Sequence, residues 1–129
     1  MGKEQEYKSN NLRVLKDQTF LRRVEMMYYI SEVRVFSYRD LQFEFGISSR
    51  MVKKDLDSLE TVFHVPLIRI KGKKTTVEKF WSATQPKLPF GICLRLVALR
   101  NRLNRLENEE EGVELIEYVV RKYGISTVL

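Results

Sequence analysis

The sequence predicts a mainly α fold with a small β-hairpin wing, an α+β arrangement, and three observations carry that prediction. Several stretches place apolar residues at the three- and four-residue spacing of one helix face. Two short stretches near the middle are rich in β-branched residues, as strands are. Serines and glycines stand between these stretches, where helices begin and turns close. With 129 residues, the chain suits one domain or one small domain with an appendage.

The N-terminal part is expected to be a flexible arm followed by a helix and a short strand. Residues 1–11 are polar and mixed in charge, which favours a frayed arm. The β-branched and aromatic stretch 33–36 predicts one small strand. Between them we expect a helix from Asp17 to Glu32, whose inner face carries Phe20, Val24, Met27 and Tyr28.

Two helices joined by a tight turn are expected next. Ser37 and Asp40 fit a capping box, in which a hydroxyl and a carboxylate each satisfy a free amide at the start of a helix. Gly46 suits the end of that helix, because glycine readily adopts a positive φ. Ser48 can cap a longer helix that runs from about Ser49 to Phe63. The buried stripe of this longer helix is expected to be Val52, Leu56, Leu59 and Phe63.

A β-hairpin is predicted after these helices. Two strand-like runs, 65–70 and 75–80, flank the sequence Lys-Gly-Lys-Lys, in which Gly72 suits a tight turn. Pro66 has no amide hydrogen and marks the start or the edge of its strand. A short helix, a tight turn, a longer helix and a hairpin form the order of a winged helix-turn-helix. We therefore expect residues 12–81 to form a winged helix-turn-helix domain, a fold that in many proteins binds DNA.

The last third of the chain is expected to be a linker, residues 82–90, followed by a helical region, residues 91–129. Gly112 is expected to interrupt that region, and a final helix is predicted from Val113 to Tyr123. Before Gly112, apolar residues repeat at four, three, four and three, which is a heptad seam. The seam residues are Ile92, Leu96, Leu99, Leu103 and Leu106.

This seam is interpreted as a dimerisation surface. Arginines alternate with the seam residues, and an acidic run at 107–111 follows them. An antiparallel pair of such helices from two copies would set Glu against Arg across the interface. The alternative, that the helix packs on its own winged domain, stays open at this point.

Composition disfavours several classes of function. Cys93 and His64 are the only cysteine and the only histidine, so the residues that most often bind zinc or form a Cys–His catalytic pair are nearly missing. We expect no metal, no cofactor and no enzymatic activity. Neither an apolar run long enough to span a membrane nor a signal-like N-terminus is seen in the sequence, so we expect a cytoplasmic protein with no membrane partner.

The net charge of +6 is unevenly distributed. Residues 1–91 hold 17 Lys or Arg against 11 Asp or Glu, and residues 92–129 hold 6 against 6. The excess of positive charge therefore belongs wholly to the first part of the chain. A basic domain joined to a neutral appendage suggests a polyanionic partner, although a solvated basic surface would give the same count.

Two basic segments are the candidate DNA-binding surface. The helix spanning 48–63 is expected to enter the major groove, with Asp57 closing its basic face. The hairpin, residues 69–79, is expected to lie on the backbone or in the minor groove. The candidate residues in the helix are Ser48, Ser49, Arg50, Met51, Lys53 and Lys54. Those in the hairpin are Arg69, Lys71, Lys73 and Lys74.

The stretch from Phe36 to Leu41, together with Gly46 to Glu60, resembles the winged helix-turn-helix of DeoR-type transcriptional regulators and of regulators that carry a WYL domain. Those families have Gly-Val-Ser and then Arg-Asp-Leu, where this chain has Gly46-Ile47-Ser48 and Lys54-Asp55-Leu56. The resemblance covers about a third of the chain and implies DNA binding through Ser48 to Lys54 and a basic wing.

Two departures from the family pattern bear on function. His64 stands where the family often has glycine, and histidine tolerates a positive φ better than most residues. The family also carries a large effector domain, whereas 48 residues follow Trp81 here, so we expect no small-molecule effector.

The sequence therefore favours a sequence-specific transcriptional regulator, a repressor for example, that acts on double-stranded DNA as a homodimer. Two recognition helices about 34 Å apart would then read a palindromic or repeated site. Two alternatives remain: a plasmid or viral replication initiator or architectural DNA-binding protein with the same fold, and a winged-helix module that binds an acidic protein.

Overall fold

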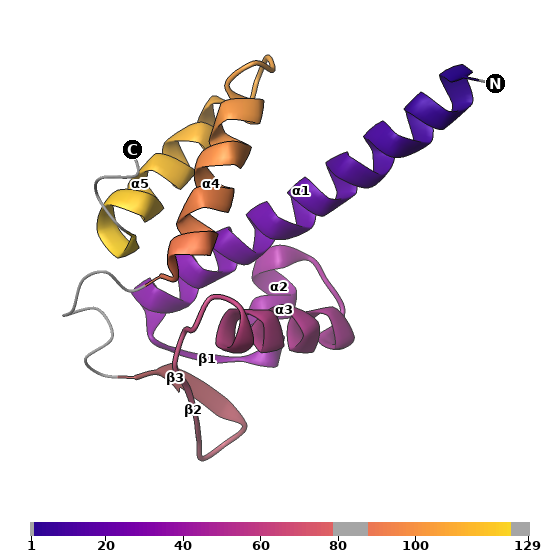
Figure 1. Cartoon of the computed structure of the whole chain (residues 1–129). Coiled ribbons are helices and arrows are strands. Elements are labelled where there is room, and N and C mark those ends of the chain that lie inside the picture. Colours follow the sequence, from indigo (N-terminus) through magenta and orange to yellow (C-terminus); the bar gives the residue numbers. More distant parts are fainter. Residues whose placement is uncertain (1, 79–87, 125–129) are drawn as a thin grey trace.

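A computed structural model describes residues 2–78 and 88–124, with side chains from Lys16 onward (Figure 1). The fold class is the predicted one, a mainly helical chain with a small antiparallel sheet. In chain order the elements are α1 (Gly2–Val33), β1 (Val35–Ser37), α2 (Tyr38–Phe45), α3 (Ser49–Thr61), β2 (Leu67–Ile70), β3 (Lys74–Val77), α4 (Phe90–Leu103) and α5 (Glu110–Tyr123).

The first helix is longer than predicted. It begins at Gly2 instead of Asp17, so residues 2–11, which were expected to form a flexible arm, lie within α1. The physical reason is local: this segment is rich in Lys, Glu and Gln, which are good helix formers, and it contains no proline. The weak apolar pattern of these residues predicted the arm, but a helix can continue without an apolar stripe.

The caps of the two central helices are the predicted ones. The Ser37 hydroxyl accepts the Asp40 amide at 3.1 Å, and the Asp40 carboxylate accepts the Ser37 amide at 2.9 Å. Gly46 ends α2 in the left-handed conformation, at a φ of 62°. The Ser48 hydroxyl accepts the Met51 amide at 3.2 Å and so caps α3. These local hydrogen bonds fix where both helices begin and how sharply the chain turns between them.

The predicted hairpin is present, and β1 joins it to make a three-stranded antiparallel sheet in the order β1-β3-β2. The pairing places Ser37 opposite Lys74, and Lys74 opposite Ile70. The turn between β2 and β3 has positive φ at Gly72 (78°) and at Lys73 (59°). We call β2, β3 and this turn the wing. The predicted end of the second strand at Phe80 lies outside the described residues.

Helix α1 is the centre of the core. Val24, Met27 and Ile30 are fully buried along it. It packs against α2 and α3 on one side and against α5 on another. Figure 1 shows the helix-turn-helix and the wing below α1, with α4 and α5 above it. The molecule is thus a single core with two groups of elements attached to one long helix.

The predicted dimerisation seam is wrong as an intermolecular surface. Its first four residues, Ile92, Leu96, Leu99 and Leu103, are at most 8% exposed within the single chain, and only Leu106 is exposed. Helix α4 packs against α5, and α5 packs against α1. The heptad spacing correctly identified an apolar face, but that face meets the apolar stripe of α5 instead of a second copy. The buried residues of α5 are Ile116, Val119, Val120 and Tyr123.

The break in the C-terminal helices also differs from the prediction. The chain turns between Leu103 and Glu110, and Gly112 lies inside the first turn of α5 instead of interrupting a helix. A side chain at Gly112 would place its Cβ 3.1 Å from a Leu103 methyl group. This glycine therefore permits α5 to approach the end of α4 closely.

Polar contacts also attach the C-terminal helices to α1. The guanidinium of Arg102 donates two hydrogen bonds to Asp17, at 2.9 and 3.0 Å. Lys122 donates to Glu32 at 3.0 Å, and this bond raises the pKa of Lys122 above its ordinary value. Both pairs join residues far apart in sequence, so they attach α4 near the middle of α1 and α5 near its C-terminal end.

The predicted linker, residues 82–90, falls mainly outside the described residues. Leu88, at its end, is buried, and its amide donates to the Tyr123 carbonyl at 2.9 Å. Phe90 already begins α4. In the described part of the chain, every helix is too short or too polar to cross a membrane.

Candidate nucleic-acid interface

The outer face of α3 carries Arg50, Lys53 and Lys54, and all three are exposed. The opposite side of the helix is anchored by Val52, Leu56 and other residues of the core. Within residues 16–78 and 88–124, none of the three cations forms an ion pair. Their charges are therefore directed to solvent from a helix whose other side is fixed.

The N-terminus of α3 contributes groups of a different kind. Ser49 is exposed, and the Ser48 hydroxyl keeps its hydrogen free to donate because its oxygen accepts the Met51 amide. Met51 is half-buried, so its side chain belongs partly to the core. Amides at a helix N-terminus are donors suited to phosphate oxygens.

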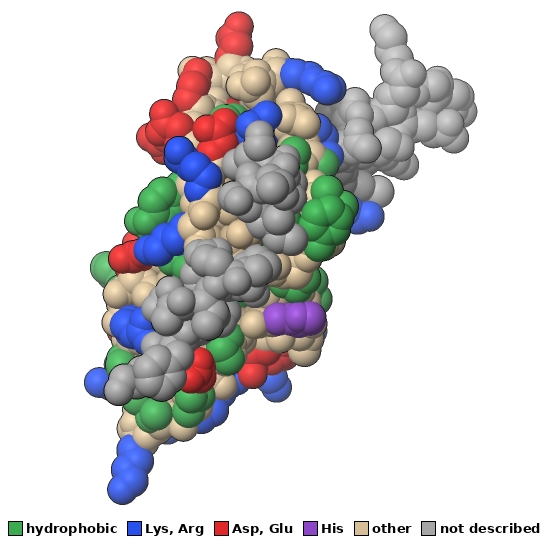
Figure 2. Space-filling view, turned by 60° about the vertical axis from the view of Figure 1, so that its left-hand side comes forward, with side chains coloured by type: hydrophobic (Ala, Val, Ile, Leu, Met, Phe, Trp, Pro, Cys, Tyr) green, Lys and Arg blue, Asp and Glu red, His purple; other side chains and the backbone are tan. Residues whose placement is uncertain are grey.

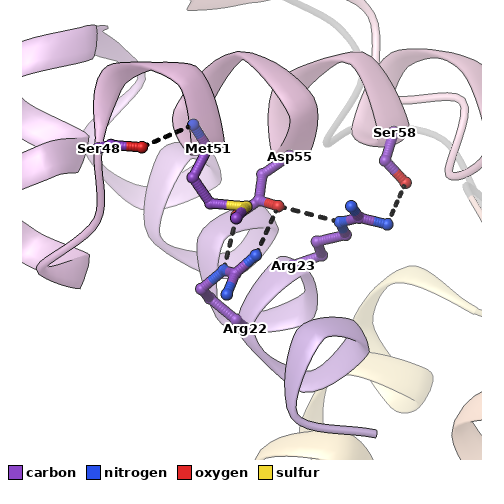
Figure 3. Close-up of polar contacts among 6 residues, drawn as sticks. All are labelled: Arg22, Arg23, Ser48, Met51, Asp55 and Ser58. Carbon is purple, nitrogen blue, oxygen red and sulfur yellow. Dashed lines mark hydrogen bonds and ion pairs between the residues drawn. The ribbon is translucent and has the colours of Figure 1, made fainter. Parts of the chain in front are cut away.

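Asp55 of α3 is completely buried, and its carboxylate lies against Arg22 and Arg23 of α1 (Figure 3). Arg22 of α1 donates two hydrogen bonds to its carboxylate, at 2.7 and 2.9 Å. Arg23 adds a third at 3.0 Å and reaches Ser58 at 3.3 Å. The hydrogen bonding of the Arg22 guanidinium to the Asp55 carboxylate raises the pKa of Arg22 above its ordinary value. One carboxylate and two guanidinium groups therefore attach α3 to α1.

A signal for this cluster was present in the sequence. Asp55 lies three residues after Val52 and four before Leu59, so it falls within the predicted buried stripe of α3. A carboxylate at such a position needs a cationic partner, because burying an unpaired charge is very unfavourable. The cluster also means that Arg22 and Arg23 contribute to the positive count of the first part but are unavailable to a ligand.

The wing holds the second group of predicted residues. Lys71, Lys73 and Lys74 are exposed at the turn and at the start of β3. Figure 2 shows basic side chains projecting at the lower end of the molecule, where Figure 1 places the wing. Acidic side chains gather toward the opposite end of the same view.

Arg69 connects the two basic segments. Its guanidinium forms an ion pair with Glu60, in the last turn of α3, at 3.0 Å. About half of the Arg69 side chain is exposed, at 51%. This residue was predicted to contact DNA directly. Its observed contact also holds the wing against the C-terminal end of α3, so it can position the wing.

The two isolated reactive residues have structural surroundings. His64 is exposed in the turn before β2 at a φ of 58°. This is the left-handed conformation that the glycine at this position in the resembled family led us to expect. Cys93 is fully buried in α4. Across the described residues, no three His, Cys, Asp or Glu side chains lie close enough together to hold a metal ion.

Comparison of the chain with protein-family models, with curated proteins and with solved structures finds no match.

Proposed function

We propose that this protein is a sequence-specific, duplex-DNA-binding transcriptional regulator, with α3 in the major groove and the wing on the backbone or in the minor groove. One observation carries the proposal: Arg50, Lys53 and Lys54 are exposed and unpaired, in the described part of the chain, on a helix whose inner face is fixed. An α-helix fits the width of the major groove of B-form DNA.

The anchoring of α3 supports recognition of bases as well as attraction to phosphate. Sequence is read by hydrogen bonds to base edges, and these need donors held in a defined position. The buried apolar stripe and the Asp55 cluster hold α3 on α1. Arg50 lies in the first turn of α3, where recognition helices usually meet base edges, and its guanidinium can bond guanine in a bidentate way.

The homodimer remains part of the proposal, but with a contact other than the heptad seam. Phe90 and Leu94 lie one turn apart on the outside of α4 and are 54% and 48% exposed. Exposed apolar side chains at this spacing can pack against a second copy. Stoichiometry on DNA measures this part of the proposal separately from DNA binding itself.

The experiment is selection of bound duplexes from a random pool, with the mass of the complex measured on the selected duplex. The proposal predicts a defined consensus and a complex of two chains per site. An array of direct repeats bound cooperatively would favour the replication-initiator alternative. A pool that remains random would contradict sequence-specific recognition, and a complete lack of binding would favour the protein-interaction alternative.

A single substitution tests how α3 reads the site. Arg50→Ala should weaken binding to the selected duplex by about 1–3 kcal/mol and relax the preference at one base position. The matched control is Arg121→Ala, which removes an exposed arginine from α5. The control should leave the consensus and the affinity unchanged. Equal effects of the two substitutions would show that Arg50 acts only through net charge.

A further inference from the structure

A basic groove of about 710 Å³ lies between α2 and the wing, apart from the outer face of α3. Arg39 and Gln42 line one wall, from the first two turns of α2. Arg69, Lys73 and Lys74 line the other, from the wing. We call this the α2–wing groove. Of these residues, Arg39 and Gln42 are not among the candidates that the sequence predicted.

The topology of the sheet explains why these residues meet. Ser37 is both the last residue of β1 and the N-cap of α2. It pairs with Lys74 of β3, which in turn pairs with Ile70 of β2. The first turns of α2 therefore start at the same end of the sheet as the wing turn. Arg39 and Lys73 are brought to one groove by backbone pairing, although they are 34 positions apart in the sequence.

The lining is positive and contains no acidic residue. Asp40, the nearest carboxylate in sequence, is engaged with the Ser37 amide at 2.9 Å. Arg39, Lys73 and Lys74 form no ion pair within the described ranges 16–78 and 88–124. Like charges held together repel one another and raise the local positive potential, and an anion would relieve that repulsion.

The backbone of the wing turn supplies a second, independent observation. Lys73 has a φ of 59°, a conformation that disfavours residues with a Cβ by roughly 1–2 kcal/mol. Glycine or asparagine would adopt it more easily, as Gly72 does next to it. A lysine at this position places a cation at the groove despite the unfavourable backbone, and strained residues of this kind cluster at functional sites.

We propose that the α2–wing groove binds a backbone phosphate of duplex DNA, with Arg39 as a contact from α2 and with Lys73 and Lys74 as contacts from the wing. This inference rests on the proposed function and deepens it. The groove would hold the strand between the helix-turn-helix and the wing while α3 reads the bases. Phosphate contacts of this kind fix the register of a protein on a duplex and carry no sequence information themselves.

The test uses the full chain and the duplex selected as described above. Arg39→Gln and Lys74→Gln should each reduce the slope of log K against log salt by about 0.9, the value of one phosphate contact. The selected consensus should stay the same. The control is Arg105→Gln, which removes an exposed arginine in the turn between α4 and α5, at the far end of the molecule from the wing (Figure 1). It should leave the slope unchanged.

Neutral methylphosphonate linkages locate the phosphate. Placed one at a time along the duplex, they should weaken wild-type binding at one or two positions, and the Arg39→Gln protein should show no loss at the same position. Lys73→Gly should reduce the salt slope and raise the melting temperature, because it removes both the charge and the unfavourable conformation. A Lys73→Gly protein with lower stability would contradict the strain argument.

The outcomes separate this inference from the proposed function. If wild-type protein ignores duplex DNA at low ionic strength, both are wrong. If it binds DNA but Arg39→Gln behaves as Arg105→Gln does, only the groove assignment is wrong. Inorganic phosphate is the probe for a free ligand: if it binds the wild-type protein but not the Arg39→Gln protein, while both proteins bind the duplex with the same affinity and salt slope, the groove holds a free phosphate and the backbone contact is wrong.

Discussion

Helices α3 and α4 both carry basic residues beside an apolar stripe, yet they use their cations in different ways. On α4, Arg102 pairs with Asp17 at 2.9 Å, and the Arg95 guanidinium lies 4.1 Å from the centre of the Phe20 ring. On α3, Lys53 and Lys54 are exposed and form no ion pair with any described residue. The cations of α4 stabilise the fold, whereas those of α3 remain available to a ligand.

The comparison teaches that amphipathic spacing identifies a buried face but does not identify what covers it. In α3 the apolar stripe and Asp55 face α1 and its neighbours. In α4 the heptad seam faces α5. Both helices therefore belong to one intrachain core, and the difference between them lies in their polar sides. The substitutions below test this difference, from the largest expected effect to the smallest.

The seam of α4 gives the largest expected effect. Leu99 is fully buried, so Leu99→Ala should lower the free energy of unfolding by about 2–5 kcal/mol. Leu106, another seam residue, is 59% exposed. Leu106→Ala should therefore change the free energy of unfolding by less than about 0.5 kcal/mol. Thermal or urea unfolding measures both. Because the seam is intrachain, the loss of free energy of unfolding in Leu99→Ala should be the same at two protein concentrations. A loss that depends on protein concentration would show that the seam lies between two copies.

The Asp55 cluster gives the next effect. Asp55→Asn leaves Arg22 and Arg23 without their carboxylate, and the free energy of unfolding should fall by about 3 kcal/mol. Asp57→Asn is the matched control, since Asp57 is exposed on the same helix. The control should change stability by less than about 0.5 kcal/mol. Similar stabilities for the two variants in urea unfolding would show that the cluster does not anchor α3.

Measuring both stability and DNA affinity for one variant in each helix sharpens the comparison. Arg102→Ala should lower the free energy of unfolding by about 0.5–1 kcal/mol and leave DNA affinity unchanged, because the pair with Asp17 is partly exposed. Lys54→Ala should do the reverse, with unchanged stability and weaker DNA binding. Unfolding curves and duplex titrations on both variants complete the cycle. Loss of DNA affinity in Arg102→Ala at the same folded fraction would break the distinction between the helices.

The smallest effect concerns acidic residues where α1 meets α5. Partial burial and the charge of Glu111 raise the pKa of Glu25 above its ordinary value of 4.5. The folded state therefore holds its proton more tightly than the unfolded state, so stability falls as pH rises through the window above 4.5. Glu25→Gln should stabilise the protein at pH 7 by less than about 0.5 kcal/mol. The advantage should disappear below pH 4.5, and an advantage that persists there would contradict this assignment.

Local features of the fold were predictable from the sequence, because their determinants lie within a few residues. Ser37, Asp40, Gly46 and Ser48 define the ends of α2 and α3, and the structure places each of them in the predicted cap. Gly72 defines the wing turn in the same way. These residues bond their own neighbours in sequence, so the sequence alone contains the information.

Features that depend on distant partners were predicted less well. The seam was assigned to a second copy because heptad periodicity identifies an apolar face but not the element that packs against it, which here is α5. The buried role of Asp55 was not predicted, because its partners, Arg22 and Arg23, are more than thirty residues away in the sequence. The groove residue Arg39 was missed for the same reason, since only the pairing of Ser37 with Lys74 brings α2 to the wing. The exposed cations of α3 and the wing were predicted from the sequence. The contacts that hold these elements in place, the Asp55 cluster and the pairing of Ser37 with Lys74, were not.

A salt titration of duplex binding tests the central claim most directly: that the cations of α3 face a nucleic acid. If five to eight phosphates are contacted, log K should fall with log salt at a slope of roughly −4 to −7 for the wild-type protein. Lys53→Ala with Lys54→Ala should reduce that slope by about 1.8, and Lys16→Ala with Arg105→Ala, the matched pair of exposed cations elsewhere, should leave it unchanged. Equal slopes for the two double variants, or no binding at low ionic strength, would contradict the account.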